Sequence, residues 1–315
     1  MKHIFALIAT AILLSTSLSS CQKIIEFNGE VTDPQLVMVS LPSADSLWRV
    51  RVTESRFFLN SDTIKHIDNA IISVEVNGIP ANTACRYEGD AVYNTGIRPR
   101  CGDSLSMHIE VPGKGSISAS CRVPQMPQAD DFRIGYDTTE YSYYDEYEDS
   151  TYIDISGNIN VSFTLHDPTD VHNYYMVSIE EWNDYSNAWD SKNITVDDNL
   201  IFPNSVTSDI LDIGLGDEEN YGSQVLFDDQ NFNGHDHRIN ISTYLWGVTK
   251  MRINVYAVNR EMYLYYKTRK AAINNDFESL GGIFGEPVQI FCNIQGGIGI
   301  LGASAAKTYM INSEL

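Results

Sequence analysis

The stretch LSMHIEVPGKGSISASC, residues 105–121, alternates apolar and polar residues on both sides of a short connection rich in glycine. Leu105, Met107 and Ile109 recur with a period of two, which is the period of a β-strand with one buried face. The connection Pro112–Gly115 contains two turn signals. This stretch therefore predicts two short strands joined by a tight turn.

The same alternation recurs upstream, over residues 36–39, 47–52 and 71–76. Short strands this close together favour an immunoglobulin-like β-sandwich over about residues 25–124. The segment VPQMP, residues 123–127, breaks the pattern, because two prolines do not fit a central strand. We place a domain boundary there.

Alternating strands resume beyond the boundary, so residues 128–315 are predicted to form a second β-rich domain. The expected strands cover residues 159–165, 174–179, 238–241 and 251–257. One helix is predicted at residues 260–273, with Asn259 as its N-cap and Glu261 near its positive end. The predicted fold class is all-β, with an N-terminal immunoglobulin-like sandwich and a second β-rich domain.

The first 21 residues resemble the export signal of a bacterial lipoprotein. Lys2 precedes an apolar run at residues 4–14, which is too short to span a bilayer as a mature helix. The sequence Leu18-Ser19-Ser20-Cys21 follows and is similar to a lipobox, so we expect residues 1–20 to be removed and Cys21 to carry lipid. Two or three acyl chains anchor a protein stably to a membrane. An ordinary signal peptide with a chance cysteine is the alternative.

The charge balance is strongly acidic, with 42 Asp and Glu residues against 21 Lys and Arg and a net charge of -21. Such a surface repels phosphate backbones, so nucleic acid is not an expected partner. Residues 136–152, YDTTEYSYYDEYEDSTY, concentrate tyrosine and acid. They are predicted to be an exposed acidic loop or hairpin, or alternatively a contact surface, since tyrosine supplies rigid amphipathic area.

Two motifs suggest chemistry that the rest of the chain does not support. Gly297-x-Gly299-x-x-Gly302 has the spacing of a dinucleotide-binding loop, yet only thirteen residues follow it, too few for a crossover helix and a second strand. We expect these glycines to let the backbone bend or bulge at a sheet edge. The segment GASAA, residues 302–306, is no nucleophile elbow, because no histidine follows residue 237.

The segment FDDQNFNGHDH, residues 227–237, matches the first half of a calcium loop. Oxygen-bearing side chains at Asp229, Asn231, Asn233 and Asp236 surround Gly234, but Asn240 stands where a bidentate Glu belongs. Weak calcium binding is therefore one hypothesis, and a polar turn between strands is the other. We expect no other cofactor, although His235-x-His237 has a spacing that suits a transition metal.

An exported chain matures in a compartment where disulfides form. Cys85, Cys101, Cys121 and Cys292 remain after the lipobox, and they allow three pairings. We favour a Cys85–Cys101 bridge, which would close a loop of fifteen residues and add about 3 kcal/mol. The absence of Cys-x-x-Cys from the sequence argues against a structural zinc site.

Taken in order, these pieces resemble one family, the Bacteroidota cell-envelope lipoproteins known as domain of unknown function four-two-four-nine. Residues 287–303, PVQIFCNIQGGIGILGA, are the most specific piece of the resemblance. The other pieces are Cys21, the strand at residues 36–39, Val123-Pro124, Asp167-Pro168, Asn173-Tyr174-Tyr175, Phe227-x-Asp229-x-x-Phe232-x-Gly234 and Tyr265-Tyr266.

The resemblance implies an outer-membrane lipoprotein, often encoded beside TonB-dependent receptors, with no catalytic residues to transfer. We therefore expect a non-catalytic accessory or ligand-binding partner of a TonB-dependent transporter. A structural or adhesive surface lipoprotein is the alternative, and a hydrolase has no support from any motif. The sequence leaves open the ligand, the face of the outer membrane, and whether the Asp-Ser and Asp-Thr sites are O-glycosylated.

Overall fold

The computed structural model describes residues 33–57, 63–145, 147, 149–169, 171–202, 221–246, 250–274 and 288–312. Residues Pro34–Leu315 form one compact unit, apart from Met1–Asp33. The predicted signal peptide and Cys21 lie outside the described residues. No helix in the described ranges has the length and apolar character needed to cross a membrane.

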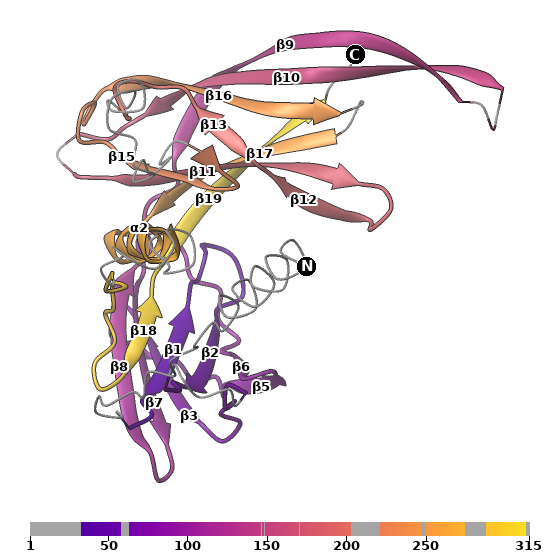
Figure 1. The fold of residues 1–315 in the computed structure, drawn as a ribbon. Coiled ribbons are helices and arrows are strands. Elements are labelled where there is room, and N and C mark those ends of the chain that lie inside the picture. The colour runs from indigo at the N-terminus through magenta and orange to yellow at the C-terminus, as the bar shows by residue number, and fades with distance from the viewer. Residues whose placement is uncertain are drawn as a thin grey trace, which may run out of the picture. The chain divides into compact units, whose positions relative to one another are not determined.

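The first half of the chain forms a β-sandwich with a single apolar core (Figure 1). One sheet has the order β18-β1-β2-β6-β5 and the other the order β4-β3-β7-β8. The strands are β1 (Leu36–Ser40), β2 (Arg49–Glu54), β3 (Ile71–Val76), β4 (Ile79–Pro80), β5 (Arg86–Gly89), β6 (Val92–Asn94), β7 (Ser104–Val111), β8 (Gly115–Arg122) and β18 (Ile298–Leu301).

The alternation that predicted β7 and β8 corresponds to the two faces of their sheet. Leu105, Met107 and Ile109 on β7 are fully or almost fully buried, and Ile117 on β8 packs in the same core. Their neighbours on the opposite face, such as His108, are exposed. β7 and β8 pair in this register because their apolar side chains then lie on the same face of the sheet.

The C-terminal glycines explain how β18 joins this sandwich. β18 lies parallel to β1, with Val37 opposite Ile298 and Ser40 opposite Leu301. Gly299 has φ +122°, and a Cβ there would overlap the carbonyl oxygen of Met38, while a Cβ on Gly297 would lie 2.5 Å from the Leu36 carbonyl oxygen. The glycines therefore permit close backbone approach at a sheet edge, as the sequence indicated. They do not begin the strand–helix–strand unit of a dinucleotide-binding fold.

The second half of the chain forms another sandwich from two sheets. One sheet has the order β14-β13-β16-β10-β9, and the other has the order β12-β11-β17-β19, with β15 also paired to β11. The strands are β9 (Gln128–Asp145), β10 (Ser150–His166), β11 (Tyr174–Asn183), β12 (Ala188–Lys192), β13 (Ile194–Val196), β14 (Tyr221–Gly222), β15 (Val225–Asp228), β16 (Asp236–Trp246), β17 (Lys250–Val258) and β19 (Ser304–Asn312). Ile159, Phe163, Val177, Ile241 and Ile253 are among the buried residues of its core.

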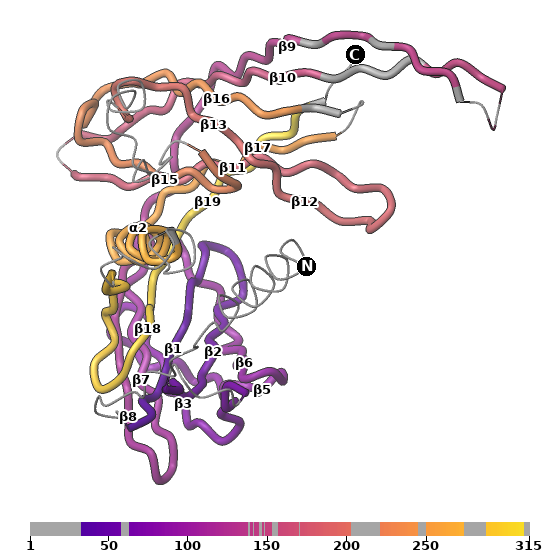
Figure 2. Tube along the Cα trace, viewed as in Figure 1, coloured from indigo at the N-terminus to yellow at the C-terminus, as the bar shows by residue number. Residues whose placement is uncertain are grey.

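The tyrosine-rich segment is a β-hairpin, one of the two forms predicted for it. Pairing of β10 with β16 ends at Ser156, whereas pairing of β10 with β9 continues to Ser150 opposite Asp145. The outer part of β9 and β10 is therefore a two-stranded ribbon that extends past its neighbour, as the traces in Figure 1 and Figure 2 show.

The predicted helix is present as α2 (Arg260–Asn274). Asn259 caps it, because its Oδ1 accepts a hydrogen bond from the Met262 N–H at 3.0 Å. The same Oδ1 accepts from the Ala303 N–H, also at 3.0 Å, so one side chain holds both the helix start and the connection between β18 and β19. Met262 and Tyr263 form a small core with Met176 and Val258.

The all-β prediction with a single credible helix is confirmed. The boundary at residues 124–128 stays a prediction, and the structure adds one fact about it. Ile294, Leu301 and Ala303, from the predicted second domain, belong to the core of the first sandwich. The sequence segment 21–124 therefore does not contain the whole of that sandwich.

Candidate functional site

Three segments that are distant in sequence border a cleft of about 880 Å³. They are the connection from β8 to β9, the loop from β10 to β11, and the end of β17 with the start of α2. The lining is mostly apolar. The lining residues are Arg122–Gln128, His166–Pro168, Val171–Tyr175 and Ala257–Arg260.

Asp167 fixes the loop between β10 and β11. Its carboxylate is almost completely buried and accepts three hydrogen bonds, from the Tyr175 hydroxyl at 2.6 Å, the Gly234 N–H at 2.8 Å and the Asn173 amide at 3.3 Å. A buried carboxylate is tolerated when its oxygens are satisfied in this way. Burial and the bond to Asp167 raise the pKa of the Tyr175 hydroxyl, which stays a donor.

Asp229 lies behind the cleft wall with none of its side chain exposed. Its Oδ2 accepts from the Asn173 N–H at 2.7 Å, while Oδ1 lies 2.6 Å from His172 Nδ1 but out of line for a hydrogen bond. Burial, followed by the charge of Asp167, raises the pKa of the Asp229 carboxyl, against the opposing effect of the Asn173 N–H. The carboxyl is thus shielded from solvent, and its burial costs free energy.

Tyr174 and His172 form the aromatic part of the cleft wall. Their rings meet edge to face at 4.8 Å, and Tyr174 also packs on Tyr263 of α2 at 4.7 Å. Burial raises the pKa of the Tyr174 hydroxyl, and the positive charge of Arg260 acts in the opposite direction. The wall therefore combines an aromatic surface with a guanidinium at its border.

The four predicted calcium ligands each have a different environment in the structure. Asp229 is buried, Asn231 donates to the Leu200 carbonyl at 2.8 Å, Asn233 donates to the Val171 carbonyl at 3.2 Å, and Asp236 contacts His166 Nδ1 at 2.8 Å. Within the described ranges no cluster of three His, Cys, Asp or Glu residues is suited to a metal ion. Calcium binding stays a prediction.

The loop geometry agrees with the polar-turn interpretation. Gly234 has φ +73°, as expected for a glycine at the turn, and the Phe232 N–H and His235 N–H close successive turns. The rings of His235 and His237 do not share a ligand. His235 Nδ1 lies 2.9 Å from the Asn233 carbonyl, and His237 Nε2 lies 2.6 Å from Asp198.

The predicted Cys85–Cys101 bridge is not formed in the structure, where Cys85, Cys101, Cys121 and Cys292 are free thiols. Cys85 leads into β5 of one sheet, and Cys101 lies in the turn before β7 of the opposite sheet. The loop length suggested a bridge, but the two segments enter different layers of the sandwich. Burial raises the pKa of the Cys121 thiol to about 12, so this thiol is unreactive.

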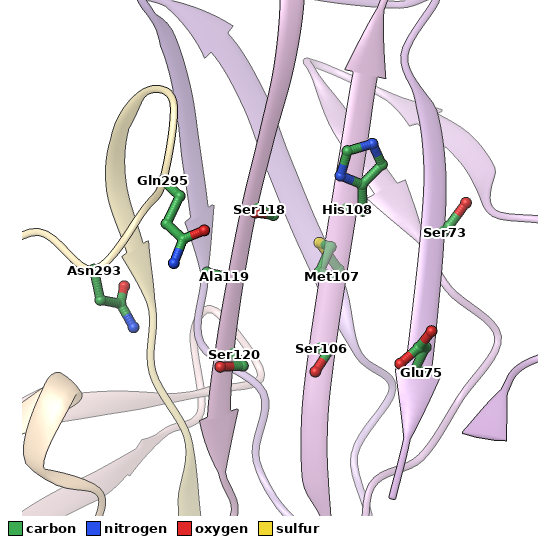
Figure 3. A pocket seen from close by; sticks show the side chains of 10 residues that line it. All are labelled: Ser73, Glu75, Ser106, Met107, His108, Ser118, Ala119, Ser120, Asn293 and Gln295. Carbon is green, nitrogen blue, oxygen red and sulfur yellow. The ribbon is translucent and has the colours of Figure 1, made fainter. Parts of the chain in front are cut away.

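A polar hollow of about 330 Å³ lies on the outer face of β3, β7 and β8 (Figure 3). Two cross-strand rows build it: Ser73, His108 and Ser118, then Glu75, Ser106 and Ser120. Asn293 and Gln295 flank the rows beside β8. Within the described residues, no hydrogen bond joins the His108 ring to one of these serine hydroxyls.

The hairpin of β9 and β10 presents aromatic side chains to solvent. Tyr147 is 101% exposed and Tyr144 is 56% exposed, and Tyr143 stacks on Tyr152 across the strands at 5.7 Å. Tyrosine in such positions supplies contact area with little loss of side-chain entropy. This hairpin is the second candidate surface.

The fold and the cleft together define an all-β protein with two sandwiches and a small-molecule-sized cleft between its connections. The chain belongs to the family described as Domain of unknown function (DUF4249), whose model matches residues 22–310. No curated protein matches the chain.

Among solved structures, the chain is similar to the "Putative membrane anchored protein from Corynebacterium diphtheriae", with 13% identity and a TM-score of 0.22. The match covers 72% of this chain and 55% of that one, so the chain spans about half the length of that protein. A likeness at this level carries no argument about fold or function.

Sequence reasoning missed the cleft but touched two of its parts. Asp167-Pro168 and Asn173-Tyr174-Tyr175 were pieces of the family resemblance, and the loop that contains them is one wall of the cleft. The cationic residues Arg122 and Arg260 gave no signal, because they lie 138 positions apart and only the tertiary fold places both on one cleft.

Proposed function

We propose that the chain is a non-catalytic lipoprotein of the outer membrane that binds a ligand and works as an accessory of a TonB-dependent transporter. The observation that carries the binding role is the apolar cleft of about 880 Å³, a volume typical of small-molecule sites. The lipobox at Cys21 supports the anchor. The resemblance of the whole chain to envelope lipoproteins encoded beside such receptors supports the partnership.

Co-purification in mild detergent tests the partnership. The full chain, tagged at its C-terminus and expressed in its own cells, is expected to recover a large outer-membrane receptor. A matched preparation of the Cys21→Ala variant is the control for nonspecific recovery of receptor in detergent. The variant lacks the anchor, so it should recover much less receptor. Repeated recovery of the wild-type chain alone contradicts the accessory role.

A hydrolytic role is tested separately with a panel of glycan and peptide substrates. We expect no turnover above the buffer rate. Hydrolysis that disappears on substitution of one described acid or histidine, such as His108→Ala, would contradict the non-catalytic proposal.

The exposed hairpin favours one further candidate function, a structural or adhesive surface protein. Tyr144 and Tyr147 are positioned to contact a macromolecule rather than a small ligand. Two results together would favour this role over transport. Protease added to whole cells would trim the chain, and deletion of the gene would leave nutrient uptake unchanged.

A further inference from the structure

The cleft wall is mostly apolar. Val123, Ala257 and Val258 are buried in it, and Val171 at its border is 56% exposed. Covering apolar surface that faces water favours binding of a ligand with an apolar body. The wall is therefore suited to the apolar body of a small molecule.

The cleft border carries positive charge in a protein whose net charge is -21. Arg122 and Arg260 both line the cleft and are exposed, and in the described part of the chain neither forms an ion pair with a carboxylate. Arg122 donates through Nε to the Gly102 carbonyl at 3.2 Å, and the charge of Arg260 acts on the nearby Tyr174 hydroxyl. Each guanidinium has five N–H donors, so donors remain for a ligand.

The negative groups near the cleft are already bonded or shielded. Asp167 accepts three hydrogen bonds, and Asp229 is fully buried beside His172. His166, which also lines the cleft, is held between the carboxylates of Asp130 at 3.0 Å and Asp236 at 2.8 Å. The carboxylates of Asp130 and Asp236 are 67% and 66% exposed, but both contact His166. Among the cationic side chains that line the cleft in the described part of the chain, those of Arg122 and Arg260 are the two without a carboxylate partner, and the positive end of the α2 dipole lies at the same border.

We propose that the cleft binds a small organic anion, whose apolar body packs on the wall of Val123, Val171 and Tyr174 and whose acidic group pairs with Arg122 or Arg260. The inference rests on the proposed function only in that both assign a binding role to the cleft. A carboxylate or sulfonate accepts bidentate, charge-assisted bonds from a guanidinium, which a neutral analogue cannot do. The preference for an anion over a neutral analogue should therefore depend on Arg122 and Arg260. The affinity for both kinds of ligand should depend on the apolar wall.

Two fluorescent probes with the same aromatic skeleton separate these contributions. 8-Anilinonaphthalene-1-sulfonate is anionic, and N-phenyl-1-naphthylamine is its neutral counterpart. The full chain is titrated with each probe in wild-type form, as Arg122→Gln/Arg260→Gln, as Val171→Asp, and as Arg51→Gln, which removes an exposed arginine on β2 away from the cleft lining. Circular dichroism shows that each variant is folded.

We expect the wild-type chain to bind the anionic probe more tightly than the neutral one. The double arginine variant should lose about tenfold in affinity for the anionic probe, as for a charged hydrogen bond of about 1.4 kcal/mol, and retain its affinity for the neutral probe. Val171→Asp should lower the affinity for both probes, and Arg51→Gln should change the affinity for neither.

Each contrary outcome refutes one part of the proposal. Equal binding of both probes to the wild-type chain refutes the anionic class while leaving a binding role for the cleft. Binding that is unaffected by Val171→Asp, or binding of neither probe, refutes the cleft as the site. A receptor recovered in the co-purification would still support the accessory role in either case, so the two proposals fail separately.

Discussion

Gly299→Ala should destabilise the protein much more than an alanine at another glycine with positive φ. Gly299 has φ +122°, where an L-residue is strained by about 1–3 kcal/mol. The added Cβ would also overlap the Met38 carbonyl oxygen, which belongs to the backbone and cannot rotate away. The strand β18 must therefore shift away from β1.

The cost of that shift follows from what β18 buries. Ile300 and Leu301 are fully buried, and full burial of one such side chain is worth about 1.5–3 kcal/mol. Partial exposure of the pair together with the φ strain gives an expected loss of about 3–5 kcal/mol in the free energy of unfolding. Gly113→Ala is the matched control, because Gly113 has φ +77° and no atom lies within 4 Å of its added Cβ. It should cost about 1 kcal/mol.

Urea unfolding of the purified full chain, followed by circular dichroism and tryptophan fluorescence, measures both variants. Trp48 lies in the core of the first sandwich and reports on its loss. A loss for Gly299→Ala no larger than that for Gly113→Ala would refute the close approach of β18 to β1. It would also remove the reason for glycine at this position.

Five further predictions concern the anchor, the helix cap, the titratable groups and calcium. Cys21→Ala should no longer incorporate palmitate or partition with membranes; a labelled variant would contradict lipidation. Asn259→Ala should cost about 1–3 kcal/mol in unfolding experiments, because two backbone N–H groups lose their acceptor, whereas Asn259→Asp keeps that acceptor and should lie close to wild type. Hydrogen bonds that the His166 ring donates to Asp236 and Asp130 raise the pKa of His166 above 6.5, so the stability advantage of wild type over His166→Gln should be full below pH 6.5 and decline as pH rises through the folded pKa. An advantage independent of pH would contradict the two carboxylate contacts. Burial raises the pKa of the Asp229 carboxyl from 3.8, so its ionisation opposes folding, and Asp229→Asn should gain stability relative to wild type as pH rises from about 4 towards 7. Thermal melting of the wild-type chain should be unmoved by millimolar calcium, and a rise abolished by Asp229→Ala would support the metal hypothesis instead.

Local sequence pattern was sufficient for the parts of the fold that local physics determines. The period-two runs at residues 105–111 and 117–121 became β7 and β8, and Asn259 caps a helix that begins where the pattern indicated. The glycine-rich segment was correctly assigned to a sheet edge. The strand periodicity and the helix cap depend on neighbours within a few positions along the chain, and the glycine spacing alone indicated a bend or bulge.

Features set by distant residues were not available from the pattern. The Cys85–Cys101 bridge was favoured from loop length, which contains no information about which sheet each cysteine enters. The cleft depends on the meeting of residues 122–128, 166–175 and 257–260, and no periodicity encodes that meeting. Asp229 was one of four candidate calcium ligands because its spacing matches a calcium loop, and that spacing contains no information about its complete burial in the fold.

The parallel pairing of β18 with β1 has a consequence for the order of folding. The Gly302 N–H donates to the Ser40 carbonyl across 262 positions of sequence, and the Ser304 N–H donates to the Pro42 carbonyl nearby. β19 follows directly and completes a sheet of the other sandwich by pairing with β17. The last strands of the chain are therefore the closing members of both sandwiches, and contacts of such high contact order form slowly. Both sandwiches remain incomplete until residues 298–312 are available to pair, so we expect the two sandwiches to fold late and as one cooperative body.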